Sequence, residues 1–280
     1  TWSASLWFVK IVHLTDNRFH MNITTYTPEY NGSSAIVYKK GDLLNVSKSI
    51  QTRIESYGDK FEETWMELQD GKHTVWAFQL TKDLNEEERF EKMRLAGNAL
   101  AIKVNALGLD RIKIEGPYQA EICEGAILGN YQFLKFFSDA HKRRNSLVKI
   151  FVEDENSKDI KRIQHATLGT LLARDLVNRP VIDLTASKLA EEAKAAGKRH
   201  GFSVEVLEKK QIESLKMGGL LGVNYGSVEP PTFTIMEYKG AGATNSQPIV
   251  LVGKGVVYDT GGLSLKPSNF MDTMKSDMGG

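Results

Sequence analysis

The chain has 280 residues, of which 41% are hydrophobic and 25% are charged, and this composition excludes disordered, collagen-like and disulfide-scaffold proteins. Its 36 Lys and Arg residues balance 35 Asp and Glu residues, so the net charge of +1 creates no general attraction for nucleic acid or for a membrane. The single cysteine, Cys123, excludes an internal disulfide and zinc sites built on cysteine pairs. We therefore expect a cytoplasmic protein whose binding functions are local.

The first twenty residues contain a short apolar patch, residues 6–12, which Lys10 interrupts. A membrane span needs about 20 apolar residues. The patch also lacks the basic start and the cleavage site of a secretory signal. Because Met21 follows directly, we interpret residues 1–20 as a leader or an added segment.

Residues 21–155 are predicted to form an N-terminal α/β domain, because strand and helix patterns alternate along them. Runs rich in β-branched and aromatic residues predict the strands, and three glutamates after Asn85 favour the first turn of a helix. The predicted strands are 34–38, 74–78, 111–114 and 147–152, and the predicted helices are 85–100 and 121–138.

A polar run at residues 153–159 is the predicted domain boundary. Apolar residues then recur at spacings of three and four up to Val177, which predicts a long helix that ends before Pro180. We assign residues 156–180 to a linking helix and residues 181–280 to a second α/β domain. Its predicted elements are a helix at 186–200 and strands at 202–207, 232–238 and 248–253.

The second domain contains a glycine-rich stretch directly after its predicted apolar strand, where ligands of open α/β sheets gather. Its glycines flank Lys254 and Asp259, which allows the backbone to approach a bound species closely. The stretch matches neither the dinucleotide fingerprint nor the phosphate loop. Asp259 and Asp277 are hard oxygen donors for divalent cations, and a lysine beside metals can donate a neutral amine. The alternative interpretation is that Lys266, Asp272, Lys275 and Asp277 are a solvated surface of mixed charge.

Two strings of residues decide between these interpretations. They are Gly-Lys-Gly-Val-Val-Tyr-Asp-Thr-Gly-Gly at 253–262 and, after Lys266-Pro267, Met-Asp-Thr-Met-Lys-Ser-Asp-Met-Gly-Gly at 271–280. This pattern resembles the leucyl aminopeptidase family, the M17 dinuclear metallopeptidases. Residues 172–180 and 222–231 also resemble segments of that family. One departure is Tyr258, where phenylalanine is commoner.

The resemblance implies a role for each matching residue. Lys254 would be a metal ligand through its neutral amine, Asp259 would bridge two metals, and Asp277 would bind the same metal as Lys254. Lys266 would be the electrophilic catalyst. Asp277 and Lys266 would also contact substrate, and Met274 would line the pocket for the first side chain of the substrate. The alternative for Met274 is an ordinary core residue.

The resemblance also implies two divalent metal ions, Zn²⁺ or Mn²⁺ with Mg²⁺ as a third candidate, and a bridging water that attacks the peptide carbonyl. The family's remaining ligands, and the arginine that holds a bicarbonate, belong to an Asn-Thr-Asp-Ala-Glu-Gly-Arg motif that residues 1–280 lack. We therefore expect the active protein to continue past Gly280, or this chain to be a fragment.

The expected function is removal of N-terminal leucine or other apolar residues from peptides, by a protein that the resemblance implies is a homohexamer. The alternative is a non-catalytic binding or scaffold member of the family, with its own ligand or with DNA. The balanced charge argues against nucleic acid, and nothing in the apolar patch indicates a membrane partner. A histidine-based zinc protease is disfavoured because the chain has no His-Glu-x-x-His motif.

Overall fold

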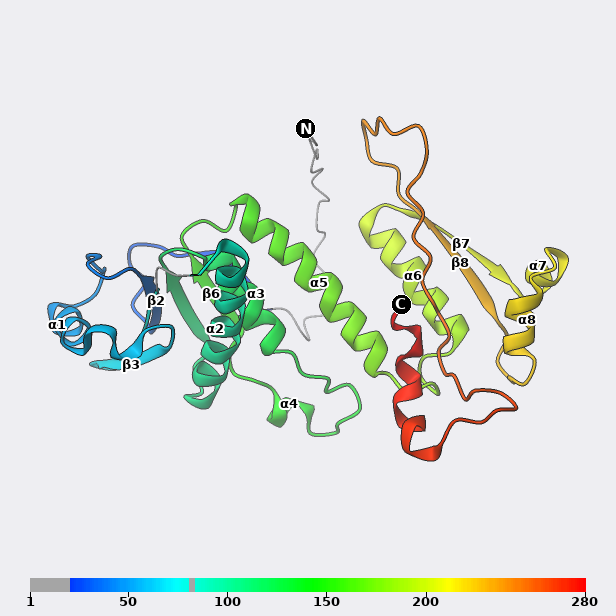
Figure 1. The fold of residues 1–280 in the computed structure, drawn as a ribbon, viewed down its shortest axis with the longest axis horizontal. Helices are drawn as coiled ribbons and strands as arrows, with labels where there is room; N and C mark the ends of the chain where they lie inside the picture. The colour runs from blue at the N-terminus through cyan, green and yellow to red at the C-terminus, as the bar shows by residue number, and fades with distance from the viewer. Residues whose placement is uncertain (1–20, 81–83) are drawn as a thin grey trace. The chain divides into compact units, whose positions relative to one another are not determined.

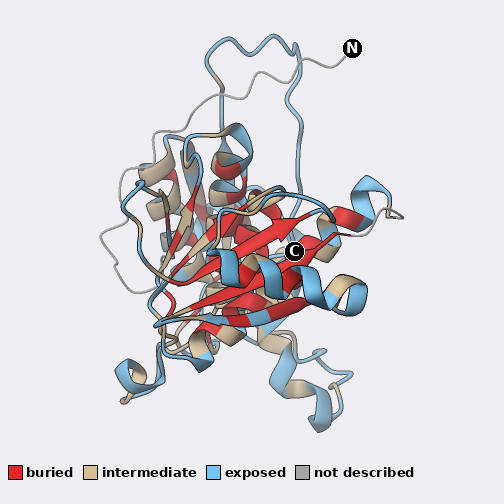
Figure 2. Cartoon of the chain, turned by 90° about the vertical axis from the view of Figure 1, so that its left-hand side faces the viewer, coloured by how far each residue is buried: buried red, intermediate tan, exposed pale blue. Residues whose placement is uncertain are grey.

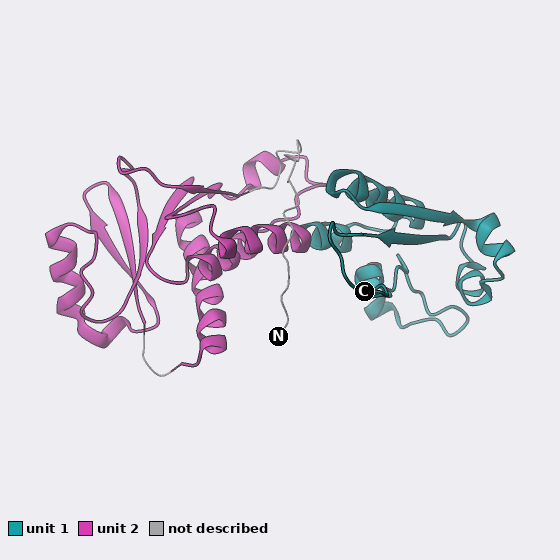
Figure 3. Cartoon of the chain, turned by 90° about the horizontal axis from the view of Figure 1, so that it is seen from above, with its two compact units in different colours: residues 1–16, 172–280 teal, residues 17–171 magenta. Residues whose placement is uncertain are grey.

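The computed structural model describes residues 21–80 and 84–280, so the interpretation of residues 1–20 lies outside the described residues. The chain divides into two compact units between residues 171 and 172 (Figure 3). We call the part before this point, magenta in Figure 3, the first unit, and residues 172–280, teal in Figure 3, the second unit. The dividing point lies inside one helix, α5 (Lys158–Asn178), which runs from the first unit into the second. Both units combine helices with strands, which confirms the α/β class.

The first unit is built on a six-stranded sheet, of which Figure 1 labels β2, β3 and β6. The order of its strands is β1-β6-β5-β2-β4-β3. Only β3 is antiparallel to its neighbour, β4. The parallel pairs include Ile23 with Ile150 and Ile36 with Ala77. The strands are β1 (Asn22–Thr25), β2 (Ser34–Tyr38), β3 (Trp65–Asp70), β4 (His73–Gln79), β5 (Arg111–Glu115) and β6 (Lys149–Val152).

Helices cover the sheet on both faces, and its strands are the most buried part of the unit (Figure 2). Successive side chains of a strand point to opposite faces. Accordingly, Ala35 and Val37 of β2 join the cluster that includes α2 and α3, whereas Ile36 and Tyr38 join the cluster that includes α1. The helical elements are α1 (Lys48–Tyr57), the 3₁₀ helix η1 (Gly58–Phe61), α2 (Glu86–Ala106), α3 (Gln119–Gly129) and α4 (Ala140–Arg143).

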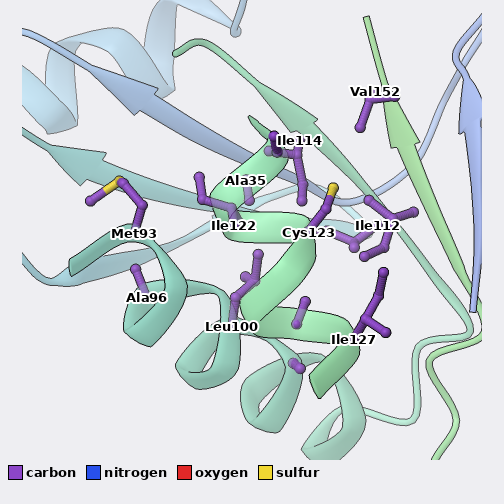
Figure 4. Close-up of a cluster of buried hydrophobic side chains, with 14 of the residues drawn as sticks. Ala35, Met93, Ala96, Leu100, Ile112, Ile114, Ile122, Cys123, Ile127 and Val152 are labelled. Carbon is purple, nitrogen blue, oxygen red and sulfur yellow. The ribbon is translucent and has the colours of Figure 1, made fainter. Parts of the chain in front are cut away.

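The helices α2 and α3 pack at very short range, because glycines lie where they meet (Figure 4). A Cβ atom on Gly97 would lie 2.1 Å from the carbonyl oxygen of Ile122, and one on Gly125 would lie 1.8 Å from that of Arg94. Cys123 lies in the same packed layer, where complete burial raises the pKa of its thiol. The cysteine is therefore a core residue.

Most predicted elements of the first unit are present, and one is too long. The helix predicted from residue 85 begins with a capping box, in which Asn85 Oδ1 accepts from the Glu88 amide and Glu88 accepts from the Asn85 amide. The helix predicted over 121–138 ends at Gly129, so its second half is wrong. There the Asn130 side chain donates to the carbonyl of Leu147 and turns the chain back toward the sheet.

The second unit contains an antiparallel pair, β7 (Ser203–Glu208) and β8 (Thr232–Glu237), with α6 (Ala186–His200) on one face. A Cβ atom on Gly197 of α6 would lie 2.6 Å from the side chain of Val204, which shows how closely the helix approaches the strand. The remaining elements are α7 (Lys209–Ser214), α8 (Gly218–Asn224) and the 3₁₀ helix η2 (Ser268–Gly279).

The strand predicted over 248–253 is wrong, because the structure leaves this segment irregular. Its apolar side chains are exposed, with Ile249 at 88% and Val252 at 94%. A fully buried strand needs neighbouring strands beside it and cover on both faces. Among the described residues, β7 and β8 pair only with each other, so the segment has no strand to join.

The polar run at 153–159 connects β6 to α5 and lies within the first unit. The sequence-based division into 21–155, 156–180 and 181–280 therefore places its boundary earlier in the chain than the contact-based division does. We retain the linking helix as a proposal. No helix among the described residues combines the length and hydropathy that a membrane crossing requires.

Candidate metal centre

The structure brings together the charged residues of the glycine-rich loop and of η2. Lys254 Nζ forms an ion pair with Asp277 and lies 3.5 Å from Asp259 Oδ2. Lys266 Nζ lies 3.1 Å from the same Asp259 oxygen. These four side chains form one cluster of two carboxylates and two amines, which we call the Lys-Asp cluster. The contacts join Lys254, Asp259, Lys266 and Asp277. The alternative of a solvated surface of mixed charge at Lys266, Asp272, Lys275 and Asp277 stays a prediction.

Met274 lies beside the cluster, because Lys266 Nζ donates to Met274 Sδ at 3.0 Å. The methionine is half-buried rather than part of either buried core cluster. Its contact with Lys266 places a flexible apolar side chain next to the amine that the sequence assigned to catalysis.

Tight turns of the loop depend on two glycines. Gly261 has a φ of +88°, and a Cβ atom there would lie 2.5 Å from the carbonyl oxygen of Ser264. Its amide donates to Asp259 Oδ1 at 2.9 Å and so fixes the carboxylate. A Cβ atom on Gly253 would lie 2.6 Å from the carbonyl oxygen of Gly280. The glycines therefore let the two cluster-bearing segments approach each other, as the sequence predicted.

The charges of the cluster stabilise one another. The Lys266 ammonium, followed by the Gly261 amide, lowers the pKa of Asp259 to about 2. The carboxylate of Asp277 is the main cause that raises the pKa of Lys254 above its ordinary value. The Lys254 ammonium thus lies as a cation between two carboxylates. A neutral amine at this position, which the resemblance implies, requires another cation to lower the pKa of Lys254.

The donor set fits a divalent cation. Two hard carboxylates already converge on a positive charge, and the buried Asp277 Oδ2 forms an ion pair with the Lys254 ammonium. Among residues 21–80 and 84–280, no three His, Cys, Asp or Glu side chains gather as a metal site. The further donor that the resemblance implies is the Lys254 amine, which lies between the two carboxylates.

Two site features escaped the sequence analysis. The Tyr258 hydroxyl donates to the carbonyl of Met271, and Lys275 Nζ donates to the carbonyl of Asn178. The sequence analysis noted Tyr258 as a departure from the family pattern, and this departure was the only indication of its contact. Lys275 gave no signal, because its partner is a backbone atom 97 residues earlier in the chain.

Comparison with known proteins identifies the segment that carries this cluster. Residues 171–280 match the model of the cytosol aminopeptidase family, catalytic domain, Peptidase_M17. The chain belongs to the M17 aminopeptidase family. The resemblance that the sequence motifs indicated is thereby confirmed.

Relatives match more of the M17 chain than the family model does. A probable cytosol aminopeptidase of Chlorobaculum parvum is 39% identical over 224 residues, which cover 70% of this chain and 43% of the relative. A probable cytosol aminopeptidase of Clostridium perfringens is 35% identical over 253 residues, covering 85% of this chain and 51% of the relative. The chain therefore spans about half the length of these curated relatives, or less.

Solved structures agree on the fold of the M17 chain. The bottromycin maturation enzyme BotP in complex with Mn gives a TM-score of 0.68 at 25% identity, covering 89% of this chain and 53% of BotP. A mutant of tomato leucine aminopeptidase gives a TM-score of 0.71 at 20% identity, covering 94% of this chain and 57% of the tomato chain. The tomato comparison supports the α/β architecture alone.

Proposed function

We propose that this M17 protein is a metal-dependent aminopeptidase whose metal centre includes Lys254, Asp259 and Asp277. The observation that carries the proposal is the convergence of both carboxylates on one cationic group, within the segment that matches the catalytic-domain model. The names of the curated relatives support peptide hydrolysis from the N-terminus.

Each residue of the Lys-Asp cluster has a distinct task in this proposal. Asp259 and Asp277 would hold divalent metal, with Asp259 in the bridging role, and Lys254 would complete the donor set with its amine. Bound metal supplies a Lewis acid that polarises a carbonyl and activates water. Lys266 is placed to donate to the carbonyl oxygen of a substrate and to stabilise the oxyanion as it forms. Its present partners, Asp259 and Met274, hold the ammonium group at the cluster.

Substrate preference follows from Met274. A flexible thioether adapts to apolar side chains of varied shape, and the contact with Lys266 supports a role for Met274 in the pocket for the first side chain of the substrate. We propose peptides with N-terminal leucine or another apolar residue as substrates.

The wider assignments are proposals of the same kind. We propose two metal ions, with Mn²⁺ favoured because BotP was solved with Mn, and Zn²⁺ as the second candidate. A bicarbonate site would need the arginine motif that residues 1–280 lack. Cytoplasmic location agrees with the relatives' names. The homohexamer rests on the resemblance to the family.

A lysine substitution tests the proposed chemistry. In the full-length protein loaded with Mn²⁺, Lys266→Ala should lower the turnover of leucine p-nitroanilide by roughly 100-fold or more, because an oxyanion stabiliser is lost. Metal content, measured by mass spectrometry of bound ions, should not change. Lys239→Ala, at an exposed lysine outside the cluster, is the matched control.

Unchanged turnover in Lys266→Ala would contradict the role of this residue. A wild-type protein that binds Mn²⁺ poorly and hydrolyses no anilide would instead favour the non-catalytic alternative.

A further inference from the structure

The 3₁₀ helix η2 carries Asp277 and Met274, and a hydrogen bond ties it to the loop that carries the rest of the cluster. The Tyr258 hydroxyl donates to the carbonyl oxygen of Met271 at 2.9 Å, and the contact is partly buried. Tyr258 directly precedes Asp259. The bond therefore joins the two segments that bring the carboxylates of Asp259 and Asp277 together.

This tie matters because η2 has weak internal support. A 3₁₀ helix has poorer hydrogen-bond geometry than an α-helix and is uncommon at lengths above three or four residues. Yet η2 extends over 12 residues. Of these, Met278 alone is buried. Contacts to other segments must therefore contribute to its position.

A second contact anchors η2 at Lys275. Lys275 Nζ donates to the carbonyl of Asn178 at 3.0 Å, at the last residue of α5. Terminal helix carbonyls lack intrahelical partners and favour a cation. The neighbouring Arg179 is buried and binds Asp183 and Glu192 at 2.5 and 2.7 Å, so the anchor point is itself held in place. The Lys275 contact and the Tyr258 bond therefore hold η2 at two positions along its length.

We propose that Tyr258 is a positioning residue, whose hydroxyl holds η2 so that Asp277 lies where it can share a cation with Asp259 and Lys254. Tyr258 touches neither the reacting atoms nor the metal in this role, and it acts through the backbone of Met271. The proposal rests on the proposed function for its consequence at the metal. The tie itself is a property of the chain and can be measured without metal.

The test is Tyr258→Phe, which removes one oxygen atom and leaves the ring in place. In the metal-free full chain, amides of residues 268–279 should exchange hydrogen about three- to tenfold faster than in the wild type, because a hydrogen bond that stabilises η2 is lost. Mn²⁺ affinity, measured by calorimetric titration, should fall by a similar factor of about three to ten. At saturating Mn²⁺, kcat for leucine p-nitroanilide should stay within about twofold of the wild-type value, because Tyr258 makes no contact with the reacting groups.

Tyr225→Phe is the matched control, because it removes the same oxygen atom from a tyrosine that is 94% exposed. This substitution should change neither the exchange of residues 268–279 nor the Mn²⁺ affinity. Equal exchange over 268–279 in Tyr258→Phe and the wild type would overturn the tie. Faster exchange with unchanged Mn²⁺ affinity would overturn its role in positioning Asp277. A wild-type protein that binds no Mn²⁺ would overturn the proposed function and this consequence with it, while the exchange measurement would still decide the tie.

Discussion

The two units differ in how their residues are held. In the first unit, all five residues of β2 are buried, with helices on both faces of the sheet. In the second unit, residues 239–267 form neither helix nor strand, and Val252 and Leu263 are exposed. The charged cluster lies at the end of this irregular segment. The candidate metal centre therefore lies among residues that ion pairs and a few hydrogen bonds hold, rather than in a packed sheet.

In many proteins, loops carry the binding residues and a rigid scaffold positions those loops, and this difference agrees with that pattern. Packing in the first unit excludes even a methyl group at Gly125. By contrast, the cluster is held by charge, with the Lys254 ammonium between the two carboxylates. We expect the two units to respond to different perturbations, and the following predictions test this.

Proteolysis should show the largest difference. Trypsin should cut after Lys239 or Lys254 roughly 100-fold faster than at any site within residues 86–129, because segments without regular structure open at low free-energy cost. Arg89 serves as an internal control, since its side chain is buried and paired with Glu63. Mass spectrometry of the first fragments measures the order of cleavage. First cuts within α2 or α3 would contradict the comparison.

A smaller effect is expected from one methyl group in the core. Gly125→Ala should lower the free energy of unfolding of the first unit by about 1–3 kcal/mol, because the new Cβ atom meets the Arg94 carbonyl and forces α2 and α3 apart. Urea denaturation followed by tryptophan fluorescence measures the change, since Trp65 and Trp76 are buried in this unit.

The control for this prediction is Gly169→Ala. Gly169 lies in α5 with no atom within 4 Å of an added Cβ, so alanine should raise the stability by about 0.5–1 kcal/mol through helix propensity alone. Equal effects at Gly125 and Gly169 would show that the close packing of α2 against α3 is not a constraint.

Sequence patterns predicted elements well where local signals and packing agree. The capping box at Asn85 and Glu88 marks the start of α2, a continuous apolar run marks β4, and alternating isoleucines mark β5. Five elements of the first unit were not predicted, namely β1, α1, η1, β3 and α4. In β3, exposed Glu67 and Gln69 alternate with buried Met66 and Leu68, which is a strand pattern that the sequence analysis missed.

The strand expected at 248–253 shows the limit of local reading. Its apolar run satisfies the pattern of a buried strand, but a strand forms only beside another strand. Among the described residues, no strand pairs with this segment. The hydrophobicity of a segment indicates that it can be buried, but its burial also requires neighbouring elements that cover it.

The candidate site was more predictable than the strand. The motif spacing placed Lys254, Asp259, Lys266 and Asp277 together, and the structure shows their contacts. The positions of Tyr258 and Lys275 could not be predicted, since both donate to backbone carbonyls that no side-chain pattern specifies.

The central claim is that the Lys-Asp cluster is the metal centre of an aminopeptidase. The most direct measurement is Mn²⁺ content together with leucine p-nitroanilide turnover, in the full-length protein and in Asp259→Asn. Asp272→Asn, at an exposed aspartate of η2, is the matched control. The account predicts that Asp259→Asn loses bound metal and loses turnover by roughly 100-fold or more, because a charged ligand is removed. Retention of both metal and turnover in Asp259→Asn would contradict it.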